Sequence, residues 1–247
     1  MYSQIEHSKK HLQLGDLTMN CESFPEFTSL PRYLTKWGIW HLLKSNRKKE
    51  AKNQLLYIPF MAATCEAFGS PYLQPLLFWR AIGFEMAYHG YKLSIKELDQ
   101  SDHDSPTTVG SFMLAAGNYA CAEILIGHAL KRKTSILGKE HPSTLVLINN
   151  MAIIQSEKGK KDEALKLYRK SLELKESTLG YENQSTLATM ANLGAHLSKM
   201  GSLKEAKEIL EKASDYHCKI LGTKNIGTLK TKSFLANLLL QYGQNIE

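Results

Sequence analysis

The sequence predicts an all-α fold: a solenoid of helical hairpins that follows an irregular helical region. Three observations predict it. One short stretch recurs at a step of 42 residues, two glycine breaks recur at the same step, and the whole chain has only seven prolines. The recurring stretch reads SILGKEHPSTL at 135–145, STLGYENQSTL at 177–187 and KILGTKNIGTL at 219–229. A fixed period of this length indicates stacked repeats, each of which is one supersecondary unit.

Other positions follow the same step and show where the helices end. The aligned columns are Gly117, Gly159, Gly201 and Gly243; Ala122, Ala164 and Ala206; Leu137-Gly138, Leu179-Gly180 and Leu221-Gly222; and Thr144-Leu145, Thr186-Leu187 and Thr228-Leu229. A glycine break about every 20 residues contradicts a coiled coil, which needs sustained heptads. Each period is therefore expected to hold two helices.

The first helix of a period is predicted over 143–159. Leu145, Ile148, Met151, Ala152 and Gln155 share one face at helical spacing. Ser143 or Thr144 is expected to cap its start, and Gly159 is expected to end it in the left-handed conformation.

The second helix follows at once and ends at Gly180. Its apolar positions are Ala164, Leu165, Tyr168, Leu172 and Leu179. The small alanine lets the two helices approach closely. A single hairpin cannot bury its apolar face alone, so neighbouring hairpins are expected to stack, joined by the LG…HPSTL stretch.

The pattern LGKEHPSTLVLINNMAIIQSEKGKKDEALKLYRKSLELKESTLG resembles a tetratricopeptide repeat of the kinesin-light-chain-like type, over about 106–243. Small residues stand where that family has them: Ala152, Gly194 and Ala236 in the first helices, Ala164 and Ala206 in the second. Because residues before about 104 do not follow the repeat, two regions are predicted: an irregular helical region or degenerate repeats at 1–104, and a solenoid of about 3.5 repeats at 105–247. The last repeat is expected to be truncated, because the sequence stops shortly after Gly243 and leaves its second helix missing.

The region at 1–104 is also helical in pattern. The stretch LPRYLTKWGIWHLLKSN places Tyr33, Leu34, Trp37, Trp40, His41 and Leu43 on a broad aromatic stripe. The order of this stretch and of PLLFWRAIG resembles the segment that precedes the repeats in NACHT/STAND-type signalling ATPases, including the nephrocystin family. That resemblance implies a sensor or regulatory role beside an ATPase.

Composition excludes several classes of protein. No stretch approaches 18 consecutive apolar residues, which excludes a transmembrane helix, and MYSQIEHSKKHLQLG is not a secretory signal. Cys21, Cys65, Cys121 and Cys218 stand far apart, which suits reduced packing residues in a cytoplasmic protein. The formal charge of +7 favours acidic partners or a polyanion.

No catalytic residue, cofactor or metal site is predicted. The stretch Gly127–Thr134 resembles a phosphate loop, but Arg132 stands where glycine is needed and the stretch lies in a predicted helix. His7 and His11 lack a third metal ligand. The basic runs at 47–49 and 131–133 are interpreted as solvated helix faces, so nucleic-acid binding is disfavoured but kept as a polyanion alternative.

The candidate binding residues are polar. Asn150 and Asn192 lie 42 residues apart in the first helices, which line the concave groove in the family that the chain resembles. An amide offers both a donor and an acceptor to a bound peptide backbone. Asn149 falls near the same groove, and Lys199 and Lys230 are placed to meet a carboxylate there. The alternative is that these asparagines serve only the local backbone or solvent.

The sequence thus predicts a non-catalytic scaffold that binds a peptide or protein segment, favouring acidic ligands. Two alternatives remain: a regulatory fragment that docks on an ATPase or on its own copies, and a polyanion binder. Self-association through the truncated last repeat is also predicted, since its second helix is expected to be missing.

Overall fold

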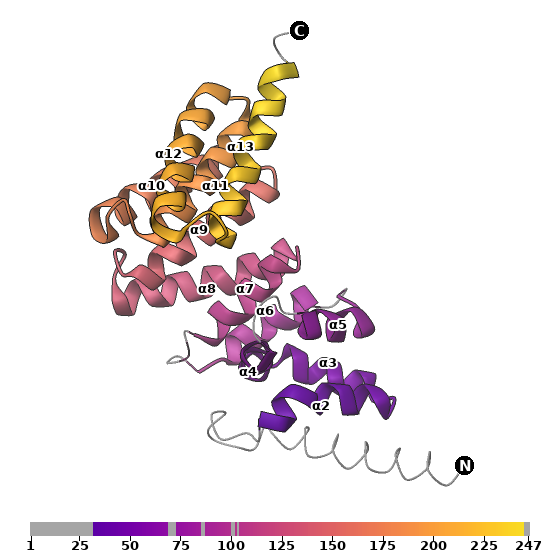
Figure 1. Cartoon of the computed structure of the whole chain (residues 1–247). Helices are drawn as coiled ribbons and strands as arrows, with labels where there is room; N and C mark the ends of the chain where they lie inside the picture. Colours follow the sequence, from indigo (N-terminus) through magenta and orange to yellow (C-terminus); the bar gives the residue numbers. More distant parts are fainter. Residues whose placement is uncertain (1–31, 69–72, 85–86, 100–101, 103, 245–247) are drawn as a thin grey trace. The chain divides into compact units, whose positions relative to one another are not determined.

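A computed structural model describes residues 32–244 apart from 69–72, 85–86, 100–101 and 103 (Figure 1). The regular structure of these residues is entirely helical. The chain forms two compact units, residues 1–129 and 130–247, which divide within helix α8 (Tyr119–Leu137). The boundary predicted at residue 104, where the repeats are expected to begin, stays a prediction.

The N-terminal unit packs short helices around aromatic side chains. Its helices are α2 (Arg32–Lys44), α3 (Lys48–Leu56), α4 (Ile58–Phe68), α5 (Leu73–Ile82), α6 (Ala87–Glu97), α7 (Ser105–Ala115) and the first part of α8. Trp79 and Tyr91 are fully buried, and their ring centroids lie 5.9 Å apart. The Tyr91 hydroxyl donates to the Leu55 carbonyl oxygen at 2.8 Å, which ties α6 to α3.

The predicted aromatic stripe on α2 is only partly right. Ile39 and Leu42 are fully buried, whereas Trp37 keeps 36% of its surface exposed and Trp40 is half-buried. Aliphatic side chains thus form the inner face of α2, and the tryptophans lie at its edge. Side-chain placement of Tyr33 and Leu34, and all of His7, His11 and Cys21, falls outside the described residues.

The C-terminal unit is a solenoid of hairpins, as predicted. It contains the end of α8, then α9 (Pro142–Glu157), α10 (Lys161–Leu179), α11 (Gln184–Met200), α12 (Leu203–Leu221) and α13 (Ile226–Gln244). Each of α9 to α12 packs against the next helix in sequence, and α11 also contacts α9 and α13 (Figure 1). Leu147 and Ile154 of α9, outside the predicted apolar face, are also fully buried.

The first helices are capped two residues earlier than predicted. His141, not Ser143 or Thr144, caps α9: its Nδ1 accepts from the Ser143 backbone N–H at 3.2 Å, and Pro142 occupies the first turn. Asn183 and Asn225, each one repeat further on, accept in the same way from the second following N–H, both at 2.8 Å. Proline suits the first helical position because its missing N–H would have no partner there.

Glycines end the helices in both columns. Gly201 has φ 85°, and the following N–H of Ser202 bonds back to the Leu197 carbonyl oxygen at 3.0 Å, which satisfies the helix end. Gly180 has φ 81° and ψ 166°, a conformation essentially restricted to glycine. Gly243 differs from its column, because it lies inside α13 without a positive φ.

Small residues set the distance between the two helices of a hairpin. A methyl group built on Gly194 would lie 2.6 Å from Leu210 Cγ of α12. Ala152, Ala164 and Ala206 are fully buried in the same apolar cluster. The predicted close approach at these columns is therefore what the structure shows.

A buried lysine joins one hairpin to the next. Lys175 of α10 is 2% exposed, and its Nζ donates to Thr189 Oγ1 at 2.8 Å and to the Ser185 carbonyl oxygen at 3.3 Å, both on α11. Burial lowers the pKa of Lys175 to about 8. One repeat later, His217 takes the equivalent place and hydrogen-bonds Thr231 at 2.9 Å. The junction thus repeats with a different basic residue.

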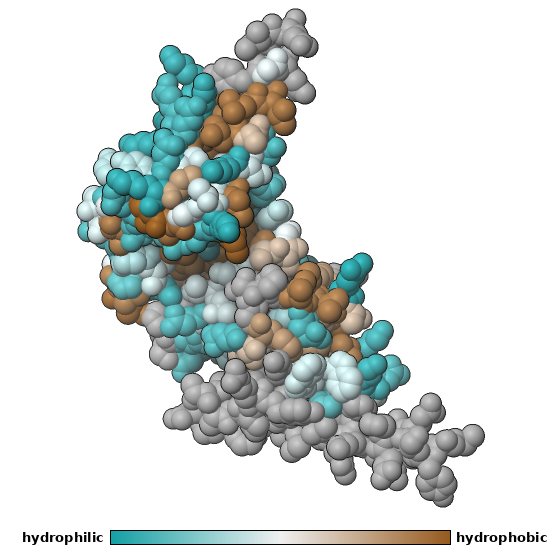
Figure 2. All heavy atoms as spheres, in the orientation of Figure 1, coloured by the Kyte–Doolittle hydropathy of each residue, from teal (hydrophilic) through white to brown (hydrophobic). Residues whose placement is uncertain are grey.

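The last helix, α13, has an exposed apolar side. Leu238 is fully buried against the preceding hairpin, whereas Leu229 and Leu240 are 52% and 68% exposed. Figure 2 shows apolar side chains gathered along this helix.

Candidate functional site

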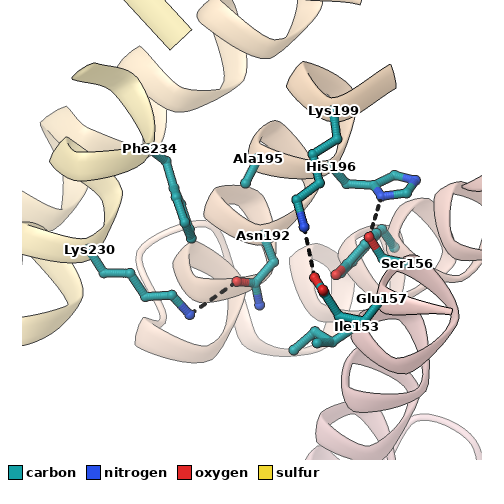
Figure 3. A pocket seen from close by; sticks show the side chains of 10 residues that line it. Ile153, Ser156, Glu157, Asn192, Ala195, His196, Lys199, Lys230 and Phe234 are labelled. Atoms are coloured by element: carbon teal, nitrogen blue, oxygen red, sulfur yellow. Dashed lines mark hydrogen bonds and ion pairs between the residues drawn. The ribbon is translucent and has the colours of Figure 1, made fainter. Parts of the chain in front are cut away.

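A pocket of about 200 Å³ opens among the helices of the C-terminal unit. Four helices supply its walls: α9, α10, α11 and α13. Its lining combines apolar and polar side chains, from Ile153, Ser156, Glu157, Tyr168, Asn192, Ala195, His196, Lys199, Lys230 and Phe234 (Figure 3). Three of the five residues proposed from the sequence, Asn192, Lys199 and Lys230, line it.

Asn192 lies at the centre of a chain of hydrogen bonds. Its Nδ2 donates to Asn149 Oδ1 at 3.5 Å. Its Oδ1 accepts from Lys230 Nζ at 3.4 Å (Figure 3). Both distances are long for hydrogen bonds. The amide therefore links α9, α11 and α13 through weak contacts that a ligand could replace at modest cost.

Lys230 is the most unusual charge in the pocket. The residue as a whole is exposed, but its ammonium group lies beside Asn192 and 5.5 Å from the centroid of the Phe234 ring. Desolvation by these neighbours lowers the pKa of Lys230. Among the described residues, no carboxylate forms an ion pair with it. Its charge is available to a ligand.

Lys199 already has a partner. Its Nζ lies 2.7 Å from Glu157 Oε1, and the Lys199 side chain is 57% exposed (Figure 3). An exposed pair of this kind contributes at most about 1 kcal/mol, so it does not prevent exchange with an incoming carboxylate. The pocket lining contains two lysines, Lys199 and Lys230, and one acidic residue, Glu157, so its net charge is positive.

His196 is a pocket residue that the sequence analysis missed. It is 2% exposed, Nδ1 lies 2.8 Å from Ser156 Oγ, and Nε2 lies 2.9 Å from the Lys161 carbonyl oxygen. A carbonyl only accepts, so Nε2 carries a proton and, in the neutral ring, Nδ1 accepts from the serine. A signal existed in the sequence: Ile154 and Leu238 occupy the same column one repeat before and after.

The two remaining candidates, Asn149 and Asn150, have different surroundings. Asn149 is 8% exposed, and its Oδ1 accepts the hydrogen bond from Asn192 Nδ2. Asn150 is half-buried and is not among the residues that line the pocket. The pair that the structure joins is Asn192 with Asn149, rather than Asn192 with its column partner Asn150.

The structure also shows the surroundings of the cysteines, of the stretch at 127–134 and of the basic run at 131–133. Cys65 and Cys121 are buried free thiols, and burial raises the pKa of Cys121 to about 11, which opposes thiolate chemistry. The stretch Gly127–Thr134 lies within α8, as predicted. One interpretation was wrong: Lys133 of the run at 131–133 is only 6% exposed, so this run is not a wholly solvated face.

No group of three or more His, Cys, Asp or Glu side chains among the described residues could hold a metal ion. Within the same residues, no helix combines the length and the apolar character needed to cross a membrane.

The C-terminal unit belongs to the class of proteins built from stacked helical hairpins. Residues 104–177 and 186–226 each match a family model described as a tetratricopeptide repeat. The chain therefore contains tetratricopeptide repeats, in the region where the sequence resemblance placed them. Such repeats generally mediate protein–protein interaction, and proteins built from them are typically non-catalytic.

Solved structures with a similar fold include kinesin-light-chain-like proteins. One is a putative kinesin light chain with nearly identical TPR-like repeats from Podosopora anserina, at 22% identity, covering 78% of this chain and 88% of that chain, with a TM-score of 0.52; a variant of the same protein gives 0.53. Another is BtubC (BKLC) from P. vanneervenii, at 18% identity, covering 81% of each chain, with a TM-score of 0.55. At these identities the likeness shows the fold alone.

A comparison with curated protein sequences found no match. The relationship to NACHT/STAND-type ATPases stays a prediction from the sequence.

Proposed function

We propose that the chain is a non-catalytic, cytoplasmic scaffold that binds a peptide or protein segment along its first helices. The pocket among α9, α10, α11 and α13 is the proposed anchor point for that ligand. The proposal combines the tetratricopeptide repeats, which generally serve protein interaction, with the polar and charged groups that line the pocket.

The observation that carries the proposal is the state of Lys230. Its ammonium group is partly desolvated, and a weak contact to Asn192 takes the place of an ion pair. A ligand carboxylate at this point would form a charge-assisted hydrogen bond, which is stronger than the contact it replaces. This supports an acidic ligand, as the sequence predicted.

The asparagines are proposed to hold the ligand backbone. Asn192 uses its amide for two long hydrogen bonds, so an extended chain can take over either one. Asn150, half-buried one repeat earlier, would offer a second amide to the same chain. Apolar ligand side chains would pack against Ile153 and Phe234.

An array of extended peptides in matched acid and amide versions tests the proposal. The unchanged chain should prefer peptides with Asp or Glu over those with Asn or Gln. Lys230→Met should remove most of this preference, whereas Lys204→Met, an exposed lysine of α12, should not. Asn150→Ala combined with Asn192→Ala should weaken binding of all peptides by about one to two powers of ten.

The proposal would be overturned if crosslinking maps a bound peptide to the pocket and the asparagine double variant binds that peptide as tightly as the unchanged chain. Equal retention of acid and amide peptides by the unchanged chain would reject the acidic ligand. Circular dichroism of each variant would check that the helices persist.

A second candidate function rests on the N-terminal unit. Trp37, Leu73, Leu77 and Leu93 are exposed to between 36% and 64%, which is a large apolar contribution to the surface of a small unit. This favours docking of a regulatory or sensor fragment on a partner such as a STAND-type ATPase. Retention of that partner by the asparagine double variant, with loss on Leu73→Asp and Leu77→Asp, would distinguish this candidate. The polyanion alternative is weakened by the burial of Lys133.

A further inference from the structure

The two lysines that line the pocket lie at different ends of it. Lys230 of α13 reaches Asn192 in the middle of α11, whereas Lys199 follows Asn192 by about two helical turns, near the end of α11 (Figure 3). The Lys199 ammonium lies 2.7 Å from the Glu157 carboxylate of α9, and the Lys230 ammonium lies 3.4 Å from an amide oxygen. The pocket therefore has a Lys230 end with a neutral acceptor and a Lys199 end with a carboxylate of the chain itself.

The Lys230 end is accessible because of the position of Lys230 in the repeat. Ala188 of α11 and Val146 of α9 occupy the same position one and two repeats earlier. Both are exposed, although a further hairpin follows each of those helices. Exposure at this position is thus a shared property of the first helices that line the pocket.

The Lys199 end is closed by side chains of three first helices. Glu157, Lys199 and Gln241 occupy one position in successive repeats, at the step of 42 residues. Lys199 pairs with Glu157 of the preceding repeat, and Ser198 Oγ donates to Gln241 Oε1 of the following repeat at 2.8 Å. These polar groups satisfy one another across neighbouring repeats. The Glu157 carboxylate therefore lies where a ligand carboxylate would meet Lys199.

Glu157 also acts on the inside of the pocket. It lines the pocket together with Tyr168 and the ion-paired Lys199. Burial raises the pKa of the Tyr168 hydroxyl, and the nearby negative charge of Glu157 raises it further. A ligand carboxylate that enters at this end would meet the same negative charge.

The two ends therefore differ in what a ligand acid can gain. At the Lys230 end, an acid exchanges a long contact to a neutral amide for a charge-assisted hydrogen bond, which is stronger. At the Lys199 end, an acid forms one exposed ion pair and breaks another, and it leaves Glu157 unpaired beside a like charge. Exchange is possible there, but it brings no net gain. Two lysines thus provide a favourable place for one acid.

We infer that Glu157 is an internal competitor for Lys199, which restricts the pocket to segments with one isolated acidic residue, held at Lys230, and uncharged residues at the Lys199 end. The inference rests on the proposed peptide site. It adds which acidic segments that site selects: isolated acids are preferred over acidic runs.

The probes are derived from one peptide of the array, the single-acid peptide whose binding falls most on Lys230→Met. A second Glu, or Gln as its neutral match, is placed at each other position in turn. Fluorescence anisotropy with the 247-residue chain then gives the ratio of Glu to Gln affinity at each position. In the unchanged chain this ratio should stay near one. In Glu157→Gln it should rise to about fivefold at the position that reaches Lys199.

Two further variants assign this rise to competition for Lys199. Adding Lys199→Met to Glu157→Gln should return the ratio to near one, because the second acid then has no partner. Glu163→Gln removes an equal charge from the exposed ion pair with Lys160, outside the pocket lining, and should leave the ratio unchanged. Circular dichroism should show the same helix content in all variants.

Three results would overturn the inference. One is a ratio that stays near one at every position in Glu157→Gln. Another is a ratio well above one in the unchanged chain. The third is a rise that persists after Lys199→Met is added, because Glu157 would then repel ligand acids without competing for Lys199. If the unchanged chain binds no array peptide, the proposed function fails and the inference fails with it, whereas binding without these changes in ratio rejects the inference alone.

Discussion

The two compact units of this chain are both helical, but their cores are built differently. In the N-terminal unit large rings fill the interior: Trp79 stacks on Phe84 with centroids 5.3 Å apart, and Tyr91 bonds a carbonyl 36 residues away. In the C-terminal unit small residues in fixed columns, such as Gly194 and Ala206, let helices approach closely. The N-terminal unit holds the largest fully buried side chains, whereas the C-terminal unit repeats small residues in equivalent contacts.

This difference teaches where each unit is vulnerable. In a repeat array each hairpin contacts mainly its neighbours, so stability is spread over similar interfaces. In the N-terminal unit the largest fully buried side chains are rings, among them Trp79 and Tyr91. A single truncation is therefore expected to cost more there than a comparable change in the repeats.

The largest effect is expected from Trp79→Ala. It removes a fully buried ring and should lower the free energy of unfolding of the N-terminal unit by about 3–5 kcal/mol. Trp37→Ala, at the exposed edge of α2, is the matched control and should cost less. Hydrogen exchange resolved by segment should show lost protection at 32–115 and retained protection at 142–221. Equal loss in both segments would show that the two units unfold together, and the comparison would fail.

The next effect is expected at the small-residue column. Gly194→Leu should cost about 2 kcal/mol, because the new side chain would collide with Leu210 and force α11 and α12 apart. Ala236→Leu, at the same column of α13, should change stability by less than about 0.5 kcal/mol, because that position is exposed. Urea unfolding of both variants measures the contrast. Similar costs would mean that α13 is covered in solution.

A stabilising change of about 1–2 kcal/mol is expected from Lys175→Met near neutral pH. The buried ammonium is protonated there at a cost, and the thioether side chain fills similar space without the charge. The lost hydrogen bonds to Thr189 and Ser185 offset part of the gain.

The pH dependence of stability gives a second readout for Lys175. Its pKa is about 8 in the folded chain and about 10.4 when unfolded, so the unfolded state binds more protons between these values. The free energy of unfolding contributed by Lys175 should therefore rise from about pH 8 to about pH 10.5, and this rise should be absent in Lys175→Met. A parallel pH profile in both proteins would show that the lysine is not desolvated.

The smallest effect is expected from the surface ion pair between Arg169 and Glu205. These side chains join α10 to α12 at 2.9 Å, but they are 56% and 44% exposed. A double-mutant cycle with alanine should give a coupling below about 1 kcal/mol that vanishes in high salt. A larger, salt-resistant coupling would mean that polar contacts between second helices, rather than small residues, hold the repeats in register.

The sequence by itself determined the repeat, the hairpins and the small-residue columns. It could do so because periodic glycines and apolar faces report local backbone conformation, which neighbouring residues decide. The helix caps were missed by two residues, since the capping column of His141, Asn183 and Asn225 was not recognised.

Only the tertiary structure decided the environments of the polar side chains. Three of the five candidate residues meet in one pocket, but the partner of Asn192 proved to be Asn149, and His196 and Phe234 joined them from other turns. The buried state of Lys133 and Lys175 was equally invisible in the sequence. Burial and hydrogen bonding depend on which side chains the packed helices bring together. The repeat pattern predicts where the helices lie in the sequence, but it does not determine which of their side chains are in contact.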